Sequence, residues 1–205
     1  GILIFNSFIN DDGLKALQKE ASKLKKDAYI SSSKYNVYIS EHDDNFHENS
    51  SRNRIMSTTK KCIPNDLIPE NSILQKIYDS SIIRSFFLDL LNKDELHPYE
   101  DSLSSININY YDKGDALGWH FDNSDFTITL LVKNCSRGGI YEFFNDIRYK
   151  DNKEDYDFVE KILDKKVKGT KINSIEGDLM IFKGNKSIHQ VTKVEEGERI
   201  LVTFN

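Results

Sequence analysis

The chain has 205 residues, of which 38% are hydrophobic and 30% are charged, the composition of a folded globular protein rather than a disordered one. Its formal net charge of -5 gives no electrostatic reason to expect nucleic acid as a partner. This length suits one domain with a sizeable core, so we expect a single domain over residues 1–205.

Cysteine content and the absence of long apolar stretches narrow the expected cellular location of the protein. Cys62 and Cys135 are too few for a disulfide scaffold and form no CxxC pair, so a reducing cytoplasm is the simpler location. No apolar stretch approaches the roughly 18 residues that cross a bilayer, and we expect no membrane partner. Residues 1–5 lack both a basic leader and an initiator Met, which indicates that one or both ends are trimmed. The oligomeric state stays open, with a homodimer as one option.

The first half of the chain predicts helices and loops. Residues 2–8 form a short strand, and Asn10 then offers an N-cap to a helix whose apolar residues recur at helical spacing as far as Leu24. Residues 29–70 are polar and contain two prolines, which indicates a long, partly irregular region and a candidate lid. Residues 72–92 predict one amphipathic helix with a broad apolar face.

The second half of the chain predicts short strands separated by turns. Residues 104–111 alternate as a strand, with Ile106, Ile108 and Tyr110 on one side. A short helix is expected at residues 155–163. The other predicted strands cover residues 126–132, 140–144, 179–182 and 199–204.

Helices followed by many short strands favour an α+β protein with a β-sandwich or double-stranded β-helix core, flanked by N-terminal helices. Within the single domain we assign residues 1–103 to helical and loop support, including the candidate lid. Residues 104–205 then form the β core. No internal repeat or low-complexity linker interrupts this division.

One group of residues points to metal chemistry. His120 and Asp122 are two residues apart, so in a strand they point to the same side. His189 follows the apolar segment 179–182 and a turn, so a neighbouring strand can bring it to the same ion. Two histidines and one carboxylate, with the opposite face open, are the ligands of non-haem Fe(II) oxygenases. A His-x-Asp pair alone is most often solvated, so this prediction depends on all three residues.

Arg199 adds a second signal, because it follows His189 by ten residues and begins an apolar segment that should be a core strand. A buried Arg is costly unless it has an anionic partner. A dicarboxylate such as 2-oxoglutarate supplies one through a two-pronged contact between guanidinium and carboxylate. The alternative is an ion pair on the surface with Glu196 or Glu198.

The pattern of His120-Phe121-Asp122, His189 and Arg199 resembles the Fe(II)/2-oxoglutarate-dependent dioxygenase superfamily. The wider sequence is similar to the branch that acts on free amino acids, which contains the radical lysine halogenases and their hydroxylase relatives. The resemblance covers residues 104–205 well, and it implies that they form the catalytic part of a double-stranded β-helix core, the jelly-roll or cupin-like arrangement. The segments that carry the narrower resemblance are Gly138-Gly139-Ile140-Tyr141-Glu142-Phe143, Asp146-Ile147-Arg148, Asp155-Tyr156 with Val159, Gly177-Asp178-Leu179-Met180-Ile181-Phe182-Lys183-Gly184 and Ser187-Ile188-His189-Gln190-Val191-Thr192.

This resemblance implies an activity and its cofactors. In the halogenases a small residue replaces the carboxylate ligand and leaves a coordination site for chloride, whereas this chain has Asp122 there. The resemblance therefore implies a hydroxylase that uses Fe(II), 2-oxoglutarate and O₂ on an unactivated C–H bond of a free, basic amino acid such as lysine. Succinate and CO₂ are released. His120, Asp122 and His189 would hold the metal, and Arg199 the far carboxylate of the co-substrate.

Further residues are candidates for the co-substrate and the substrate. Asn107 and Asn109 can reach the co-substrate if their strand borders the metal. A free amino acid presents a carboxylate, for which Arg52 and Arg54 are candidates, and a basic side chain, which needs acids or amides. The other substrate candidates are Trp119, Asn123, Asp125 and Asn205, with Glu100, Asp101 and Arg148 as lesser options. Tyr111 could reach the co-substrate like Asn107 and Asn109, but it fits the core equally well.

Three other functions stay open. The first is hydroxylation of a peptide or protein side chain, as in relatives of prolyl hydroxylase. The second is a metal-dependent hydrolase or lyase that uses Zn or Mn, against which the spacing of Arg199 argues. The third is a binding domain without catalysis, against which the complete set of ligands argues. A separate Zn site at His42 and His47 has no cysteines to support it, and these residues, like His97, are expected in solvated loops.

Overall fold

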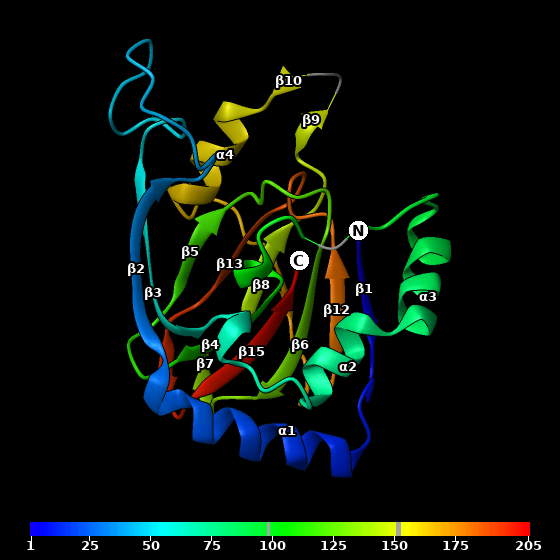
Figure 1. Cartoon of the computed structure of the whole chain (residues 1–205). Helices are drawn as coiled ribbons and strands as arrows, with labels where there is room; N and C mark the ends of the chain where they lie inside the picture. The colour runs from blue at the N-terminus through cyan, green and yellow to red at the C-terminus, as the bar shows by residue number, and fades with distance from the viewer. Residues whose placement is uncertain (98, 151–152) are drawn as a thin grey trace.

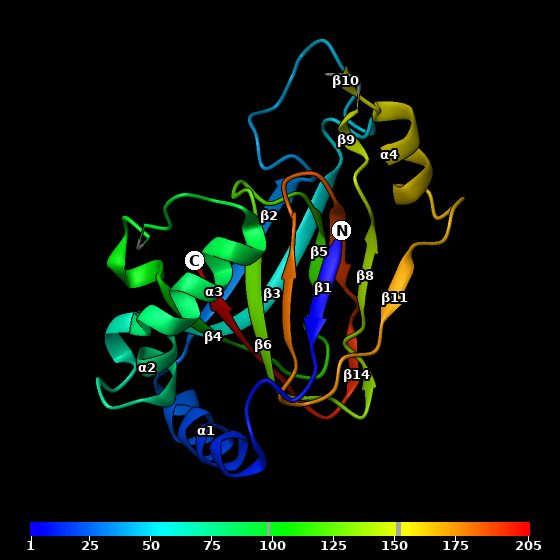
Figure 2. The same ribbon diagram turned by 90° about the vertical axis from the view of Figure 1, so that its right-hand side faces the viewer.

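The computed structural model describes residues 1–97, 99–150 and 153–205. Two antiparallel sheets face each other, and the N-terminal helices cover the outer side of the larger sheet (Figures 1 and 2). This is the α+β jelly-roll core that the sequence predicts. No helix in the described part of the chain combines the length and the apolarity that crossing a membrane requires.

The strands follow one another across each sheet in an order that differs from their order in the chain. From one edge to the other, the large sheet contains β1 (Ile2–Phe5), β12 (Leu179–Phe182), β6 (Thr127–Lys133), β15 (Arg199–Phe204), β4 (Ile106–Tyr111), β3 (Ile55–Ile63) and β2 (Tyr29–Asn36). The small sheet contains β11 (Thr170–Ile172), β8 (Tyr141–Phe144), β13 (Ile188–Val191) and β5 (Leu117–His120). Two short pairs are formed by β9 (Arg148–Lys150) with β10 (Lys153–Glu154) and by β7 (Arg137–Gly138) with β14 (Val194–Glu196). The α-helices are α1 (Asp11–Leu24), α2 (Ile73–Asp79), α3 (Ser81–Leu91) and α4 (Tyr156–Leu163).

The large sheet has two chemically different faces, because successive side chains of a strand point to opposite sides. Its helix-facing side is apolar and packs against Leu17 and Ala21 of α1, Leu74 of α2 and Phe87 of α3. A large apolar side chain buried in this way contributes about 1.5–3 kcal/mol. The strand residues in this core are Ile63, Ile106, Ile108, Tyr110, Ile128, Leu130, Val132, Leu179, Ile181, Ile200, Val202 and Phe204. The alternate residues of the same strands are therefore held toward the small sheet.

Helix α1 begins as predicted and lies across one end of the sandwich (Figure 1). The side-chain oxygen of Asn10 accepts a hydrogen bond from the backbone N–H of Gly13 at 2.9 Å, which caps the helix. The hydroxyl of Tyr110 on β4 donates to the carbonyl of Ala21 at 2.8 Å and ties the helix to the sheet.

The prediction of one helix over residues 72–92 is wrong, because the chain breaks at Ser80. Ser80 has an extended backbone, with φ of -66° and ψ of 115°, and its hydroxyl accepts from the N–H of Ile83 to cap α3. Serine favours such caps over helix interiors because its hydroxyl competes for backbone donors. The apolar spacing is preserved across the break, and it therefore conceals the break in the sequence.

The prediction of an irregular region over residues 29–70 is also wrong in large part. It contains β2 and β3, which pair without interruption from Tyr29 opposite Cys62 to Asn36 opposite Ile55. These strands are polar because β2 is an exposed edge and one side of β3 faces away from the core. The irregular part is residues 37–54, which lie beside α4 (Figure 1). There Ser51 donates to the carbonyl of Tyr156 at 2.8 Å.

Candidate metal centre

His120 and His189 are brought together by pairing in the small sheet. β5 ends at His120, and β13 runs antiparallel to it with His189 directly opposite. Asp122 lies two residues beyond the end of β5, so the expectation that it shares a strand with His120 is wrong. Its backbone N–H donates to the carbonyl of Gly184 at 3.1 Å, which fixes this short segment instead.

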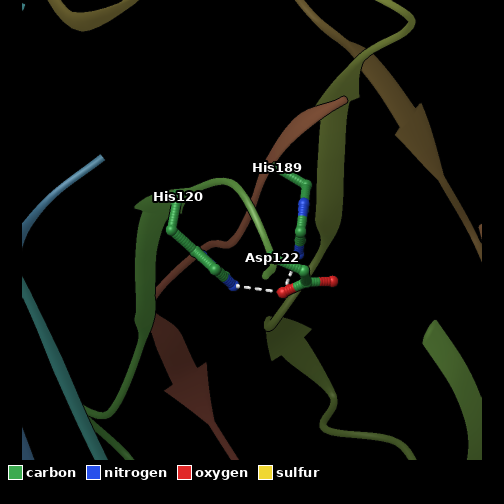
Figure 3. A group of neighbouring side chains, drawn as sticks. All are labelled: His120, Asp122 and His189. Atoms are coloured by element: carbon green, nitrogen blue, oxygen red, sulfur yellow. Dashed lines mark ion pairs between the residues drawn. The ribbon is translucent and has the colours of Figure 1, made fainter. Parts of the chain in front are cut away.

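The three side chains converge on one point (Figure 3). Oδ1 of Asp122 lies 3.2 Å from Nε2 of His120 and 3.6 Å from Nε2 of His189. One potential ligand atom from each residue lies within 4.8 Å of the others. This trio is the only group of at least three His, Cys, Asp or Glu side chains in the described chain that could hold a metal ion.

Both histidines present Nε2 to this point because Nδ1 is already engaged. Nδ1 of His120 lies 2.8 Å from the carbonyl of Gly118, and Nδ1 of His189 lies 2.9 Å from the carbonyl of Ser187. A carbonyl only accepts, so each Nδ1 carries the hydrogen and each Nε2 keeps a free lone pair. Burial, with a smaller effect of nearby His120, lowers the pKa of His189 to about 4, so its ring is neutral at pH 7.

Asp122 is held as an ionised ligand with its two oxygens in different roles. Burial alone raises the pKa of Asp122, but the two histidines and the hydroxyl of Thr127 hold it well below its usual range. Thr127 donates to Oδ2, which leaves Oδ1 facing the imidazoles. A Cβ at position 184 would lie 1.9 Å from Oδ2, so only Gly184 leaves room for this carboxylate. Two imidazole nitrogens and one carboxylate oxygen fit a divalent ion such as Fe(II).

The metal trio opens into a cavity of about 230 Å³ between the two sheets. Its wall on the large sheet is formed by the side chains that alternate with the apolar core, including Asn109, Tyr111 and Thr203. Arg199 lines the same cavity and is only 4% exposed. The cavity thus joins three side chains that could hold a metal ion to a buried cation.

Arg199 does not form the surface ion pair with Glu196 or Glu198 that was the alternative to binding a dicarboxylate. Glu198 is instead paired with Lys25 and with Lys133, at 3.1 Å for Lys133. One terminal nitrogen of Arg199 donates to Oδ1 of Asn134 at 3.1 Å, while its Nε has no hydrogen-bond partner among the described residues. A buried guanidinium with one neutral partner and an unpaired donor suits an anionic ligand.

Three of the predicted amides lie at the cavity and one does not. Asn109, Asn123 and Asn205 line it, and the buried Oδ1 of Asn109 has no hydrogen-bond partner in the described chain. Asn107 is engaged elsewhere: it accepts from the thiol of Cys62 at 3.5 Å and donates to the carbonyl of Ser104 at 2.9 Å.

The structure does not bring the predicted arginines to the cavity. Arg52 donates to the hydroxyl of Ser40 at 2.6 Å, within the loop of residues 37–54. Arg54 forms an ion pair of 2.7 Å with Asp164 after α4. Arg148, a lesser candidate, pairs with Glu154 at 2.7 Å.

Trp119 and Asp125 also lie away from the metal trio. Trp119 packs on Phe144 with ring centroids 5.7 Å apart, since neighbouring residues of β5 point to opposite sides. Asp125 pairs with Lys93 at 3.4 Å and lines a separate apolar cavity under α2 and α3.

Lys60 and Thr127 are cavity-lining residues that sequence reasoning missed. Lys60 belongs to the segment that the polar composition marked as irregular. The β-branched run that precedes it, with Thr58 and Thr59, was the available signal for a strand. Thr127 gave no signal, because its contact with Asp122 depends on the path of the chain between β5 and β6.

Comparison with known proteins gives a family. A family model described as halogenase D matches residues 1–205, the whole chain. No curated protein matches the chain in sequence.

Solved structures share the fold at low identity. HygX from Streptomyces hygroscopicus, solved with nickel and 2-oxoglutarate, aligns over 100% of this chain and 81% of its own, with a TM-score of 0.66 and 11% identity. SnoK of nogalamycin biosynthesis, described as a non-heme alpha ketoglutarate dependent carbocyclase, aligns over 99% and 78%, with a TM-score of 0.66 and 11% identity. A prolyl-4-hydroxylase from Pseudomonas putida aligns over 99% and 90%, with a TM-score of 0.59 and 14% identity. The predicted fold class is confirmed.

Proposed function

The chain belongs to the halogenase D family, and from that premise we propose that it is an Fe(II)- and 2-oxoglutarate-dependent hydroxylase of a free, basic amino acid such as lysine or ornithine. The observation that carries the proposal is one cavity that contains both the His120, Asp122 and His189 trio and buried Arg199. When bound, Fe(II) and 2-oxoglutarate supply the oxidising chemistry with O₂, which releases succinate and CO₂.

The protein's own residues bind and orient in this proposal. Nε2 of His120, Nε2 of His189 and Oδ1 of Asp122 would hold the metal. The guanidinium of Arg199 would bind the far carboxylate of 2-oxoglutarate, and the unpaired Oδ1 of Asn109 is available to a donor in the cavity. The surrounding apolar side chains of the two sheets exclude water, which strengthens these charged contacts.

Hydroxylation is favoured over the halogenation that the family description names. Asp122 fills the position where the halogenases of the resembling branch have a small residue. Its second oxygen accepts from Thr127 and lies against Gly184, so the surrounding chain is shaped for a carboxylate. Halide therefore lacks a coordination site beside the metal trio.

A small substrate is favoured over a peptide by the shape of the site. The cavity of about 230 Å³ lies between two sheets, below the roughly 300–1,000 Å³ of sites for drug-sized ligands. The Pseudomonas putida relative is a prolyl-4-hydroxylase, so peptide substrates remain the alternative to be tested.

Residues 1–205 act as one oxygenase domain in this proposal, since Lys60 of β3 and Arg199 of β15 line the same cavity. Residues 37–54 serve as the lid, and we expect them to become more resistant to proteolysis when substrate binds. Equal cleavage with and without substrate would count against a lid. The two free thiols, Cys62 and Cys135, are consistent with a reducing cytoplasm.

The test is anaerobic reconstitution with Fe(II) and 2-oxoglutarate, followed by O₂, a panel of free amino acids and both chloride and bromide. We expect succinate together with a product heavier by one oxygen atom on lysine or ornithine. A halogenated product would replace hydroxylation by the family's named activity. Succinate without an amino-acid product would move the search to peptides, and no succinate from folded, iron-loaded protein would contradict the oxygenase function.

A further inference from the structure

Lys60 and Arg199 lie in one row across the large sheet, on either side of Tyr111. Arg199 of β15 pairs with Tyr111 of β4. On the other side of β4, Cys62 pairs with Asn109 and Lys61 with Tyr110, so the next step places Lys60 beside Tyr111. Neighbouring strands are about 4.8 Å apart, so the backbones of Lys60 and Arg199 are roughly 10 Å apart. Side chains in one row project to the same side, which in this sheet is the cavity.

The side chain of Lys60 has no ion pair or hydrogen bond among the residues that the structure describes, although it lines the cavity. The adjacent Lys61 points the other way and pairs with Asp112 at 2.7 Å. Burial lowers the pKa of Lys60, because the ammonium loses water without gaining a partner. A desolvated cation of this kind is stabilised by an anion placed in the cavity.

The positions of the two cations assign them to different anions. The guanidinium of Arg199 extends toward Asn134, at the turn after β6. Lys60 lies toward the metal ligands: Thr58, two residues earlier on the same side of β3, accepts from the N–H of Gly118, and the carbonyl of Gly118 holds Nδ1 of His120. One carboxylate at Arg199 therefore leaves Lys60 unpaired.

The formal charges lead to the same conclusion. With the proposed ligands bound, the charges of the divalent ion, of Asp122, of Arg199 and of dianionic 2-oxoglutarate cancel. Lys60 is then the remaining formal charge among the described side chains that line the cavity. An amino-acid substrate brings one carboxylate, which is the missing countercharge.

We propose that Lys60 binds the α-carboxylate of the amino-acid substrate and so selects substrates that carry this group. The assignment rests on the proposed function and supplies the cation that Arg52 and Arg54 do not provide. It also orients the substrate, because the carboxylate end is held on the β3 side and the side chain is left to reach the metal trio.

The test is isothermal titration calorimetry on protein loaded with Fe(II) and 2-oxoglutarate without O₂, so that binding is read without turnover. The probes are L-lysine and L-ornithine, each compared with its decarboxylated diamine, cadaverine or putrescine. We expect the wild-type protein to prefer the amino acids. Lys60→Met should weaken amino-acid binding by about 10–100-fold, as for the loss of a hydrogen bond between charged groups, and should leave diamine binding unchanged.

Matched variants separate recognition from folding. Lys61→Met removes the neighbouring cation outside the cavity and should leave amino-acid binding unchanged. Lys60→Arg keeps the charge and should retain most of the affinity. The Tm of Lys60→Met should not fall, because the variant removes a desolvated ammonium that has no partner in the described chain.

Three outcomes would overturn the assignment. Equal affinity of Lys60→Met and wild type for the amino acids would show that Lys60 does not bind them. A loss of 2-oxoglutarate affinity in Lys60→Met, measured in a separate titration, would assign Lys60 to the co-substrate. No binding of any amino acid by wild-type protein that still binds Fe(II) and 2-oxoglutarate would reject the proposed substrate class, and the role of Lys60 with it.

Discussion

The two faces of the large sheet use the same strands for different purposes. On β6, Leu130 packs among the apolar side chains under the helices, while the adjacent Thr129 lines the cavity. On β15, Val202 and Thr203 divide in the same way. The helix-facing side thus supplies most of the stability, and the cavity side carries the polar groups. Because alternate residues face the helices and the cavity, a change on the helix-facing side should leave activity largely intact. A change on the cavity side should leave stability largely intact.

Loss of a metal ligand is the strongest test of the cavity side. Asp122→Ala removes one of three ligands, and we expect Fe(II)-dependent succinate formation to fall by roughly 1,000-fold, equivalent to about 4 kcal/mol. Its Tm without metal should change little, since the helix-facing core is untouched. Iron content and succinate rate are the measurements. An Asp122→Ala protein that retains both iron and activity would remove this residue from the metal site.

A substitution that leaves a void in the apolar core is the matching test of the helix-facing side. Leu130 is fully buried, and Leu130→Ala should lower the free energy of unfolding by about 2–5 kcal/mol in a urea titration. Activity per folded molecule should stay within about twofold of wild type. Thr129→Val, one residue away, is the control and should cost far less stability. If Leu130→Ala changed the kinetics as strongly as the stability, the two faces would not be independent.

Arg199 shares a property with each face, since its side chain is buried and also lines the cavity. Arg199→Met should raise the KM for 2-oxoglutarate by about 100-fold, because a charged pair with the far carboxylate is lost. Its Tm should be unchanged or higher, because a buried charge without an anionic partner in the described chain is removed. Arg199→Lys should be intermediate, since an ammonium makes no two-pronged contact. An unchanged KM would assign Arg199 to structure alone.

Lowering the pH should reduce folding stability through the cavity side of the large sheet and not through its helix-facing side. The pKa of His189 falls from 6.5 to about 4 on folding, chiefly because the ring is buried. Between these values the unfolded chain binds a proton that the folded chain does not, so stability falls as pH drops. Without metal we expect a loss of about 1.4 kcal/mol per pH unit at most, with a contribution from His189 that fades as the pH rises above 6.5. Urea titrations of wild type and His189→Gln should diverge in this window, and parallel curves would contradict the assignment.

Local patterns made part of the structure predictable. The alternation of Ile106, Ile108 and Tyr110 gave a strand and its buried side, and Asn10 gave the start of α1. The order of His120, Asp122, His189 and Arg199 gave the candidate site, because histidine and arginine in apolar segments need a chemical reason to be there.

Other features depend on the fold around them. β2 and β3 were missed because an edge strand and a cavity wall have polar sides, which resemble a loop in the sequence. Lys60 was missed with them. The contacts of Thr127 and Gly184 with Asp122 depend on how the chain folds back on itself, and neither residue has a local pattern that marks it.

The most direct test of the cavity as an oxygenase site is anaerobic titration of the purified protein with Fe(II) and then 2-oxoglutarate, read by bound iron and by the visible absorption that appears when a 2-oxo acid chelates Fe(II). In chloride-free buffer we predict one iron per chain and an absorption band that depends on 2-oxoglutarate in the wild type, and neither in Asp122→Ala. Folded wild-type protein that binds no Fe(II), or that binds Fe(II) but gives no band with saturating 2-oxoglutarate, would contradict the account.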